Sequence, residues 1–388
     1  MRPQPQQINL AVKRHRLLNE LFRRERAGRL ELAKHLNMNP AMVGAYMEEF
    51  VKAGLVLEEA PMPVGRGRSP VPLRLNPVHG RFLGLDFEAL RARVVTTDFS
   101  GATLFQKEVP FSPGIRREAV LKKIVALALE AAKHGKGPLL TVGIAAPGQV
   151  DVAEGRILHY ALLDDFSGVS VRERFQSHFK VPVFVEDNIR SLTLAEMLRG
   201  AGRDCRHFLC LAVRSGVGLG IVIDGKLYNG VNGMAGELGY TVFPSRQRAA
   251  TLTELISAVG VTRQMGASGR PLSAIVKAAA TDPRSQALLD KLGEHLGMVA
   301  ANLANLFAPE KIVLVGEVPS CTLRVRQRME RTFRVHTLPQ ILKTAHIEEG
   351  ALCGFAGALG AAYMGFQRIF PTDAAAFLPS SGNHASAE

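Results

Sequence analysis

The chain has 388 residues, of which 47% are hydrophobic and 21% charged, a balance typical of a globular protein rather than a fibrous or disordered one. At about 150 residues per domain, the length favours two or three domains. The net charge of +13 is unevenly spread, because residues 1–80 contain 13 Lys and Arg against 7 Asp and Glu. Such a basic segment attracts polyanions, so nucleic acid is the leading partner; an anionic membrane surface and a merely solvated face are the alternatives.

Three helices are expected near the N-terminus. Apolar residues recur at helical spacing over residues 12–24 and again, more briefly, over residues 30–36. Asn39 can cap a third helix that begins at Pro40 and extends to about Ala53. Two helices joined by a tight turn form a helix-turn-helix, whose second helix enters the major groove of DNA. On this third helix we expect DNA to be contacted by Asn39, Met42, Val43, Gly44 and Tyr46.

Two short strands should follow the helices, around residues 55–57 and 71–75, with a turn-rich loop between them. This arrangement is typical of a wing. The loop contains Gly65-Arg66-Gly67-Arg68-Ser69-Pro70, and we expect Arg66 and Arg68 to lie in a narrow minor groove of DNA, where negative potential is concentrated. A solvated Arg-Gly linker is the alternative interpretation.

Residues 32–43, the sequence Ala53-Gly54-Leu55-Val56 and the Gly-Arg-Gly-Arg-Ser-Pro loop together resemble the winged helix of transcriptional repressors in the ROK (repressor, open reading frame, kinase) family. Beyond it, strand and helix patterns alternate, which favours α/β layers. The resemblance spans about residues 10–366. It implies an N-terminal winged helix-turn-helix (α+β) at residues 1–78, joined to a two-lobed α/β body with the actin-like ATPase fold of ROK sugar kinases at residues 79–370. Residues 371–388 are expected to form a flexible tail.

Phosphoryl transfer needs bare backbone amides around the phosphates, and these are not intact here. The phosphate loop of the family reads Asp-x-Gly-Gly-Thr, whereas this chain has Asp86-Phe87-Glu88-Ala89-Leu90. Residues 215–220 resemble the second glycine loop, although a tight strand connection explains them equally well. Near the expected adenosine site, Val315-Gly316-Glu317 replaces a Gly-Gly pair. We therefore expect a degenerate ATP site and no bound cofactor.

The general base of the family is also replaced. Its kinases carry Glu-Asn-Asp before a helix ending in Ala-Glu, and Glu186-Asp187-Asn188 lies on that pattern without a gap. Asn188 then occupies the position of the base, and an amide has no usable basicity near neutral pH. Asp187, one residue away, is the only substitute nearby. We expect no catalytic residue.

Sugar binding does not require that base. Residues 230–240 resemble the sugar-binding loop of the family, with Glu237 in the place of its hydroxyl-binding acid, although a surface carboxylate is the plainer reading. Tyr240 stands where the family usually has His. The expected ligand-binding residues are Asp187, Asn188, Glu237, Tyr240 and Asp165.

The zinc loop of the family is missing, because residues 244–252 contain neither Cys nor His. In addition, Thr253 stands where the family has a sugar-binding Glu. We therefore expect no metal, and the nature of the ligand stays open. The N-terminus lacks a signal-peptide core, and the four cysteines form no CxxC pair, so we expect a cytoplasmic protein with reduced thiols. Residues 350–367 are uncharged but rich in Gly and Ala, which favours a buried helix over a membrane span.

The resemblance and the residues together predict a DNA-binding regulator, with repression favoured, whose kinase-like body senses a sugar or sugar phosphate. The expected partners are double-stranded operator DNA, the small-molecule effector and a second copy of the chain, because a two-fold dimer matches a palindromic operator. A tetramer remains open. Two other classes compete: an active ATP-dependent sugar kinase carrying a DNA-binding arm, and a DNA-binding protein whose body is only a dimerisation scaffold.

Overall fold

The computed structural model describes residues 5–61, 71–112, 114–163, 165–243, 249–266 and 271–372. Its N-terminal unit contains three helices and a pair of antiparallel strands, as predicted: α1 (Pro5–Arg24), α2 (Arg29–Leu36), α3 (Pro40–Lys52), β1 (Val56–Glu58) and β2 (Leu73–Leu75). The Asn39 side chain accepts a hydrogen bond from the backbone N–H of Ala41, at 2.9 Å, and Pro40 fills the first helical position. These two residues therefore fix where α3 begins.

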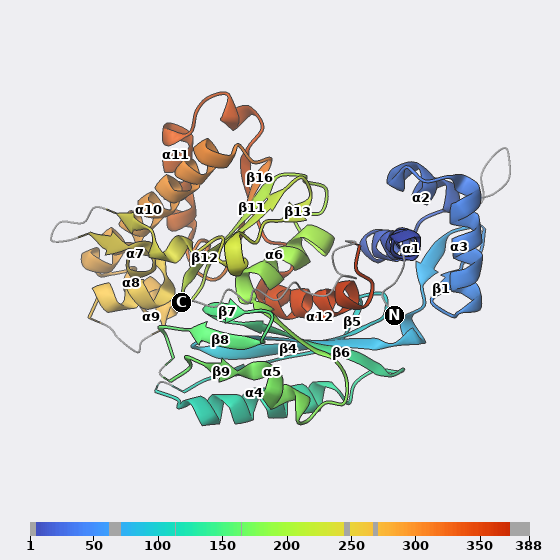
Figure 1. The fold of residues 1–388 in the computed structure, drawn as a ribbon. Coiled ribbons are helices and arrows are strands. Elements are labelled where there is room, and N and C mark those ends of the chain that lie inside the picture. The colour runs from blue at the N-terminus through green and yellow to red at the C-terminus, as the bar shows by residue number, and fades with distance from the viewer. Residues whose placement is uncertain are drawn as a thin grey trace, which may run out of the picture.

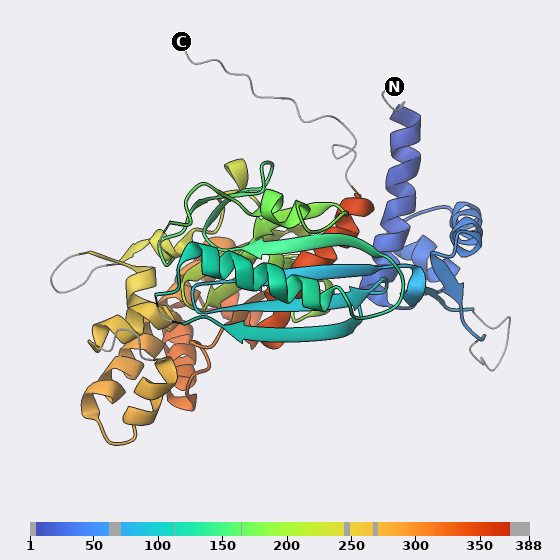
Figure 2. The same cartoon turned by 90° about the horizontal axis from the view of Figure 1, so that it is seen from below.

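The first lobe of the body is built on a five-stranded sheet with the order β10-β6-β3-β4-β5. The strands β3, β4 and β5 form an antiparallel meander, whereas β6 and β10 run parallel to β3. Helix α4 covers the outer face of this sheet (Figure 2). The elements are β3 (Arg81–Phe87), β4 (Arg91–Asp98), β5 (Thr103–Pro110), α4 (Arg117–Ala131), β6 (Leu139–Ala146), β7 (Gln149–Asp151), β8 (Arg156–His159), β9 (Val169–Ser170), α5 (Val171–Gln176) and β10 (Val183–Asp187).

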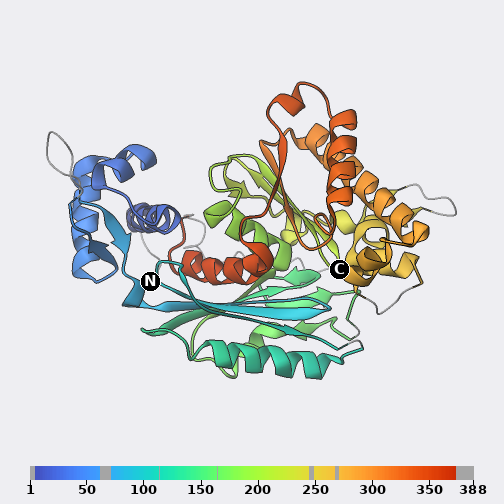
Figure 3. The same cartoon turned by 180° about the vertical axis from the view of Figure 1, so that it is seen from behind.

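The second lobe carries a five-stranded sheet with the order β13-β12-β11-β16-β17, in which β11, β16 and β17 are parallel. Helices α7 to α11 gather on one side of this lobe, away from the N-terminal unit (Figure 3). The elements are β11 (Phe208–Val213), β12 (Val217–Ile223), β13 (Lys226–Leu227), β14 (Val242–Phe243), β15 (Ala250–Thr251), α7 (Leu252–Ile256), α8 (Ala258–Gln264), α9 (Leu272–Ala278), α10 (Pro283–Phe307), β16 (Lys311–Val315), α11 (Leu323–His336) and β17 (His346–Glu349).

Two helices, α6 (Asn188–Arg199) and α12 (Ala356–Ile369), form a layer between the two sheets (Figure 1). Small residues let this layer pack closely. A Cβ atom on Gly360 would lie 1.6 Å from the carbonyl oxygen of Ser191 in α6, and one on Gly143 in β6 would lie 1.9 Å from the carbonyl oxygen of Ala361. The Gly- and Ala-rich segment therefore forms the buried helix that its composition predicts. Among the described residues, no helix combines the length and the apolar character needed to cross a bilayer.

The N-terminal unit docks against the ends of these two helices. Phe22 of α1 is buried, and its ring lies 4.3 Å from that of Phe366 and 5.1 Å from that of Tyr363, both in α12. The Asn19 side chain donates a hydrogen bond to the carbonyl of Phe370, at 2.8 Å. Leu17, Leu21 and Phe22 consequently belong to one apolar core that continues from the N-terminal unit into the α6–α12 layer.

Two helical glycines should respond in opposite directions to substitution by Ala. Gly360→Ala should destabilise the protein by about 3 kcal/mol, because its new methyl group has to displace the backbone of α6. Gly44→Ala in α3 should instead stabilise it by roughly 0.5–1 kcal/mol, since nothing lies within 4 Å of a Cβ there and Ala is the better helix former. Chemical denaturation measures both changes. Equal effects would contradict the close helix packing described above.

Candidate functional site

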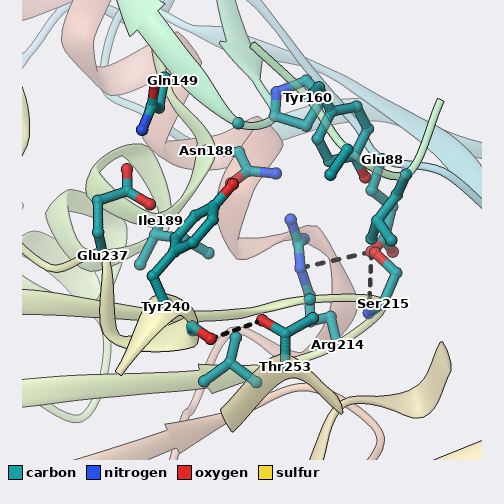
Figure 4. Close-up of a pocket in the computed structure, with 18 of the residues that line it drawn as sticks. Glu88, Gln149, Tyr160, Asn188, Ile189, Arg214, Ser215, Glu237, Tyr240 and Thr253 are labelled. Atoms are coloured by element: carbon teal, nitrogen blue, oxygen red, sulfur yellow. Dashed lines mark hydrogen bonds and ion pairs between the residues drawn. The ribbon is translucent and has the colours of Figure 1, made fainter. Parts of the chain in front are cut away.

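A cavity of about 440 Å³ lies in the cleft between the two lobes (Figure 4). Segments from both lobes form its walls: the turn after β6, the loop after β8, the start of α6, the β11–β12 loop, the segment that contains Glu237, and α7. The polar side chains among its described lining residues are those of Glu88, Gln149, His159, Tyr160, Asp187, Asn188, Arg214, Ser215, Glu237, Tyr240, Thr251, Thr253, Glu254 and Arg263.

The start of α6 supplies one wall. Asp187 ends β10 and caps the helix, because one of its carboxylate oxygens accepts hydrogen bonds from the N–H groups of Ile189, at 3.0 Å, and Arg190, at 2.9 Å. Burial raises the pKa of Asp187, against the favourable charge of Arg190. Asn188, the first residue of α6, is buried and lines the cavity. A carboxylate and an amide therefore stand side by side at the helix start.

The opposite wall comes from the segment that follows β13. Gly236 adopts a φ of +92°, and a Cβ there would lie 1.9 Å from the carbonyl oxygen of Leu219, so only glycine allows this approach to β12. The approach places Glu237 and Tyr240 at the cavity. Figure 4 shows the Glu237 carboxylate pointing into the same space as Gln149 and Asn188. Burial and the neighbouring Asp187 charge raise the pKa of Glu237.

A buried ion cluster, which we call the lobe clasp, joins the two lobes beside this cavity. It consists of Asp86 and Glu88 from the first lobe and Arg214 and Ser215 from the second. Arg214 donates a hydrogen bond of 2.7 Å to Asp86 Oδ2, and its Nε lies 3.8 Å from Glu88 Oε2. The Ser215 hydroxyl donates a 2.6 Å hydrogen bond to the same oxygen of Glu88. All four residues are buried.

The two clasp carboxyls titrate differently. Burial raises the pKa of Asp86 even though Arg214 opposes the shift. Burial would also raise the pKa of Glu88, but Arg214, the Ser215 hydrogen bond and Arg93 outweigh it and hold that pKa below its usual value. The end of β3 and the residues that follow β11 thus hold each other across the junction of the two lobes.

A second cavity, of about 790 Å³, lies between the lobes on the other side of Leu162 and Arg263, which line both cavities. Its described lining is mainly apolar and includes Leu90, Phe111, Leu272 and Cys321. Arg91 and Glu317 face each other across it, with 3.7 Å between their charged atoms. The Glu317 that replaces a family glycine is therefore part of a further contact between the lobes.

The structure brings together four of the five ligand-binding residues named from the sequence, since Asp187, Asn188, Glu237 and Tyr240 all line the first cavity. Asp165 is outside the described lining. Its side chain is exposed, while the next residue, Phe166, is buried against Phe87 in the first lobe, and its expected contact with a ligand stays a prediction.

Two of the residues expected to face DNA are also corrected. Val43 and Tyr46 are buried and pack in the core of the N-terminal unit, on the same face of α3 as Met47 and Phe50. The apolar spacing that locates α3 also defines its inward side, and both residues lie on it.

The exposed side of the start of α3 carries Asn39 and Ala41, with Met42 and Gly44 partly exposed. Arg66 and Arg68 lie outside the described residues, and their expected contact with DNA stays a prediction. The same holds for the absence of zinc, because most of the loop over residues 244–252 is also outside them.

Sequence reasoning missed several lining residues, among them Gln149, His159, Tyr160 and Arg214. Gln149 follows a Pro-Gly turn at the end of a buried strand, which is a position where ligand contacts are common in α/β folds. Arg214 could have been noticed, since it is a charged residue at the end of an otherwise apolar strand and directly before a glycine-rich loop. Neither sequence signal shows which residues Gln149 or Arg214 will contact in the fold.

The two sheets, the helical layer between them and the cleft define a kinase-like α/β body. Residues 82–368 match the model of the ROK family, so the chain belongs to this family. Among curated proteins, the chain is 27% identical over 314 residues to a xylose repressor of Caldicellulosiruptor bescii, covering 74% of this chain and 78% of the relative. It is 28% identical to the DNA-binding transcriptional dual regulator NagC of Escherichia coli, and the match covers 75% of this chain and 76% of NagC. A glucokinase of Halalkalibacterium halodurans is 27% identical, and the match covers 73% of this chain and 94% of the glucokinase.

Solved structures support the same fold. A ROK family transcriptional regulator, described as a homolog of the Escherichia coli MLC protein, superposes with a TM-score of 0.76 and 22% identity, covering 95% of this chain and 99% of that one. A ROK family glucokinase from Streptomyces griseus, in complex with glucose and AMPPNP, gives a TM-score of 0.64 with 24% identity. This match covers 74% of this chain and 99% of the glucokinase. The regulator thus matches nearly the whole chain, whereas the kinase matches about three quarters of it.

Replacing Arg214 by Met should destabilise the protein strongly, by about 3–5 kcal/mol at pH 7, because buried Asp86 loses its hydrogen-bonded counter-charge and Glu88 loses one of its three arginine partners. Without Arg214, the pKa of Glu88 should rise, so the penalty should shrink as the pH falls and the carboxyls take up protons. Chemical denaturation at pH 7 and pH 5 tests this. Arg206→Met, which removes an exposed pair with Asp224, should change little at either pH.

Proposed function

We propose that this protein is a ligand-responsive transcriptional regulator, most simply a repressor, of genes for carbohydrate metabolism. The observation that carries the proposal is that one helix, α6, begins at the cavity and ends against the N-terminal unit. Ligand binding and DNA binding then act on the same rigid element. The relatives named as a xylose repressor and as NagC support this class of function.

The N-terminal unit is proposed to bind operator DNA as a winged helix-turn-helix. Its α2 and α3 are joined by a tight turn in which Asn37 adopts a left-handed conformation, and β1 and β2 form the base of the wing. The exposed start of α3, from Asn39 to Met42, is the part that would enter the major groove. A homodimer would present two such helices to a palindromic operator.

The cavity is proposed to hold a sugar. Its lining offers acceptors and donors at the edge of a partly apolar space, as recognition of hydroxyl groups requires: Asp187, Glu237, Asn188, Gln149 and Thr253. The residues at the start of α6 supply two of these contacts. A glucokinase that was solved in complex with glucose shares the fold, which supports a sugar as the class of ligand.

We further propose that the body lacks phosphoryl transfer. Asn188 stands at the start of α6 where an acid is needed, and Asp187 is engaged in capping the helix. The segment that resembles the phosphate loop carries two carboxylates that are paired with Arg214, and this supports the loss of phosphate binding. ATP-dependent phosphorylation of a sugar that disappears in Asp187→Ala would contradict this part of the proposal.

The far end of α6 holds α1 of the N-terminal unit. Arg199, the last residue of α6, pairs with Glu25 at 2.5 Å, donates hydrogen bonds to the carbonyls of Phe22 and of Ser100, the latter at 2.7 Å, and lies over the Phe22 ring at 5.0 Å. Arg23 of α1 in turn donates to the carbonyl of Arg203, at 3.1 Å. A shift of α6 on ligand binding would therefore move α1 with it.

Removing the two wing arginines should weaken DNA binding. In Arg66→Ala with Arg68→Ala, we expect lower operator affinity and a slope of log K against log salt that falls by about 2, because each arginine would release roughly one counterion from a phosphate. Fluorescence anisotropy over a salt series measures both quantities. Unchanged affinity and slope would remove the wing from the proposed DNA interface.

Arg199→Ala should separate sensing from DNA release. We expect sugar affinity to stay within about twofold and the affinity for operator in the absence of sugar to stay within about threefold, while the change in operator affinity caused by sugar falls at least fivefold. Arg203→Ala is the matched control, because only the main chain of that residue contacts α1. If Arg199→Ala responds to sugar as the unaltered protein does, α6 is not the connection.

A further inference from the structure

The charge of the first cavity bears on which sugars it accepts. Its described lining contains four carboxylates, of Glu88, Asp187, Glu237 and Glu254, against the guanidinium groups of Arg214 and Arg263. Glu88 and Arg214 satisfy each other within the lobe clasp, and the Glu254 carboxylate accepts a hydrogen bond from the backbone N–H of Thr251 at 2.8 Å. Asp187 caps α6 through Oδ1, and its second carboxylate oxygen and the Glu237 carboxylate are then the groups that would face the ligand.

Among the described residues, Arg190 lies behind these two carboxylates and is already engaged. Arg190 is buried; it hydrogen-bonds Glu186 through Nε, at 2.8 Å, and through Nη2, at 2.6 Å, and its remaining nitrogen donates to the carbonyl of Gly233. The group formed by Glu186, Asp187, Glu237 and Arg190 therefore carries an excess of negative charge. Burial raises the pKa of both Asp187 and Glu237, and each feels another carboxylate nearby.

Among the described lining residues, Arg263 is the cation outside the lobe clasp. It lies in α8, where the two cavities adjoin, and it is exposed to solvent. Charge there is screened by water and salt far more than charge at the buried start of α6. The interior wall of the cavity consequently offers hydrogen-bond acceptors and negative charge.

We propose that the cavity selects unphosphorylated sugars, whether neutral or carrying an amine, and rejects sugar phosphates. Hydroxyl and ammonium groups can donate to Asp187 and Glu237, whereas a phosphate dianion would be brought against like charge in a partly desolvated space. This inference rests on the proposed function, since it names the chemical class of the ligand for the same site.

The test compares matched sugars on the full-length protein by calorimetric titration and thermal unfolding. The probes are xylose, glucose, glucosamine and N-acetylglucosamine, together with the 6-phosphates of the three hexoses. We expect at least one unphosphorylated sugar to bind and stabilise the protein, and a phosphate to bind at least tenfold more weakly than its parent. A phosphate that binds as tightly as its parent overturns the inference but leaves the proposed function standing. No binding by any probe overturns both.

Glu237→Gln tests the assigned source of this selectivity. The change keeps the shape of the side chain and removes its charge, so the ratio of phosphate to parent dissociation constants should fall at least fivefold. Glu294→Gln, which neutralises a carboxylate on the surface of α10, should leave the ratio unchanged. An unchanged ratio in Glu237→Gln, with the fold intact by thermal unfolding, assigns the charge discrimination elsewhere and overturns the role of Glu237.

Discussion

The close packing of α12 on α6 is the constraint on which both binding regions of this protein depend. Gly360 meets the main chain of Ser191 with no room for a side chain, and Gly84 and Gly143 let α12 approach the first sheet in the same way. Backbone packed on backbone keeps α12 from sliding along α6, because any relative displacement breaks several van der Waals contacts at once. The two helices would therefore move as one rigid unit, and α6 within it runs from the cavity to the contacts with α1.

The lobe clasp shows how a kinase-like body can keep its two lobes together by its own residues. Arg214 faces Asp86 and Glu88 across the junction, and Ser215 adds a neutral hydrogen bond. Arg214 finds both of these carboxylates in the first lobe, whereas Glu88 also has Arg91 and Arg93 of its own lobe within 3.9 Å. Contact between the lobes is thus built into the chain.

Much of the fold could be predicted from the sequence because its signals are local. The start of α3 at Pro40, the buried strands and the Gly- and Ala-rich α12 follow from capping residues and apolar spacing, and they occur where those patterns indicate. Helix α1 instead begins at Pro5, well before the apolar spacing that starts at residue 12. Four cavity-lining residues could be placed because they lie in two recognisable sequence segments, at the start of α6 and in the glycine-rich stretch before Tyr240. Asp165 is not in the described lining, because the direction of a loop residue depends on where its neighbour Phe166 finds a core, and that is a long-range property.

The error on α3 has a different physical origin. A helix has one apolar side, and the residues that identify the helix in a sequence are mainly those of that side, so Val43 and Tyr46 were more conspicuous than the small exposed residues beside them. The lobe clasp could not be predicted either, because Arg214 and Asp86 are 128 positions apart in the chain. Pairings over such separations depend on the tertiary fold.

The distribution of charge separates the two kinds of binding that the structure supports. A chain with a net charge of +13 attracts anions, and its basic N-terminal segment would attract a nucleic acid most strongly. The same field would also concentrate small phosphorylated metabolites near the body. In the proposed sugar site, Arg190 and Arg214 are both paired with internal carboxylates, so the acidic inner wall would oppose that attraction inside the cavity. A protein that is basic overall would then still favour uncharged or cationic ligands in its cavity, since buried local charge outweighs screened distant charge.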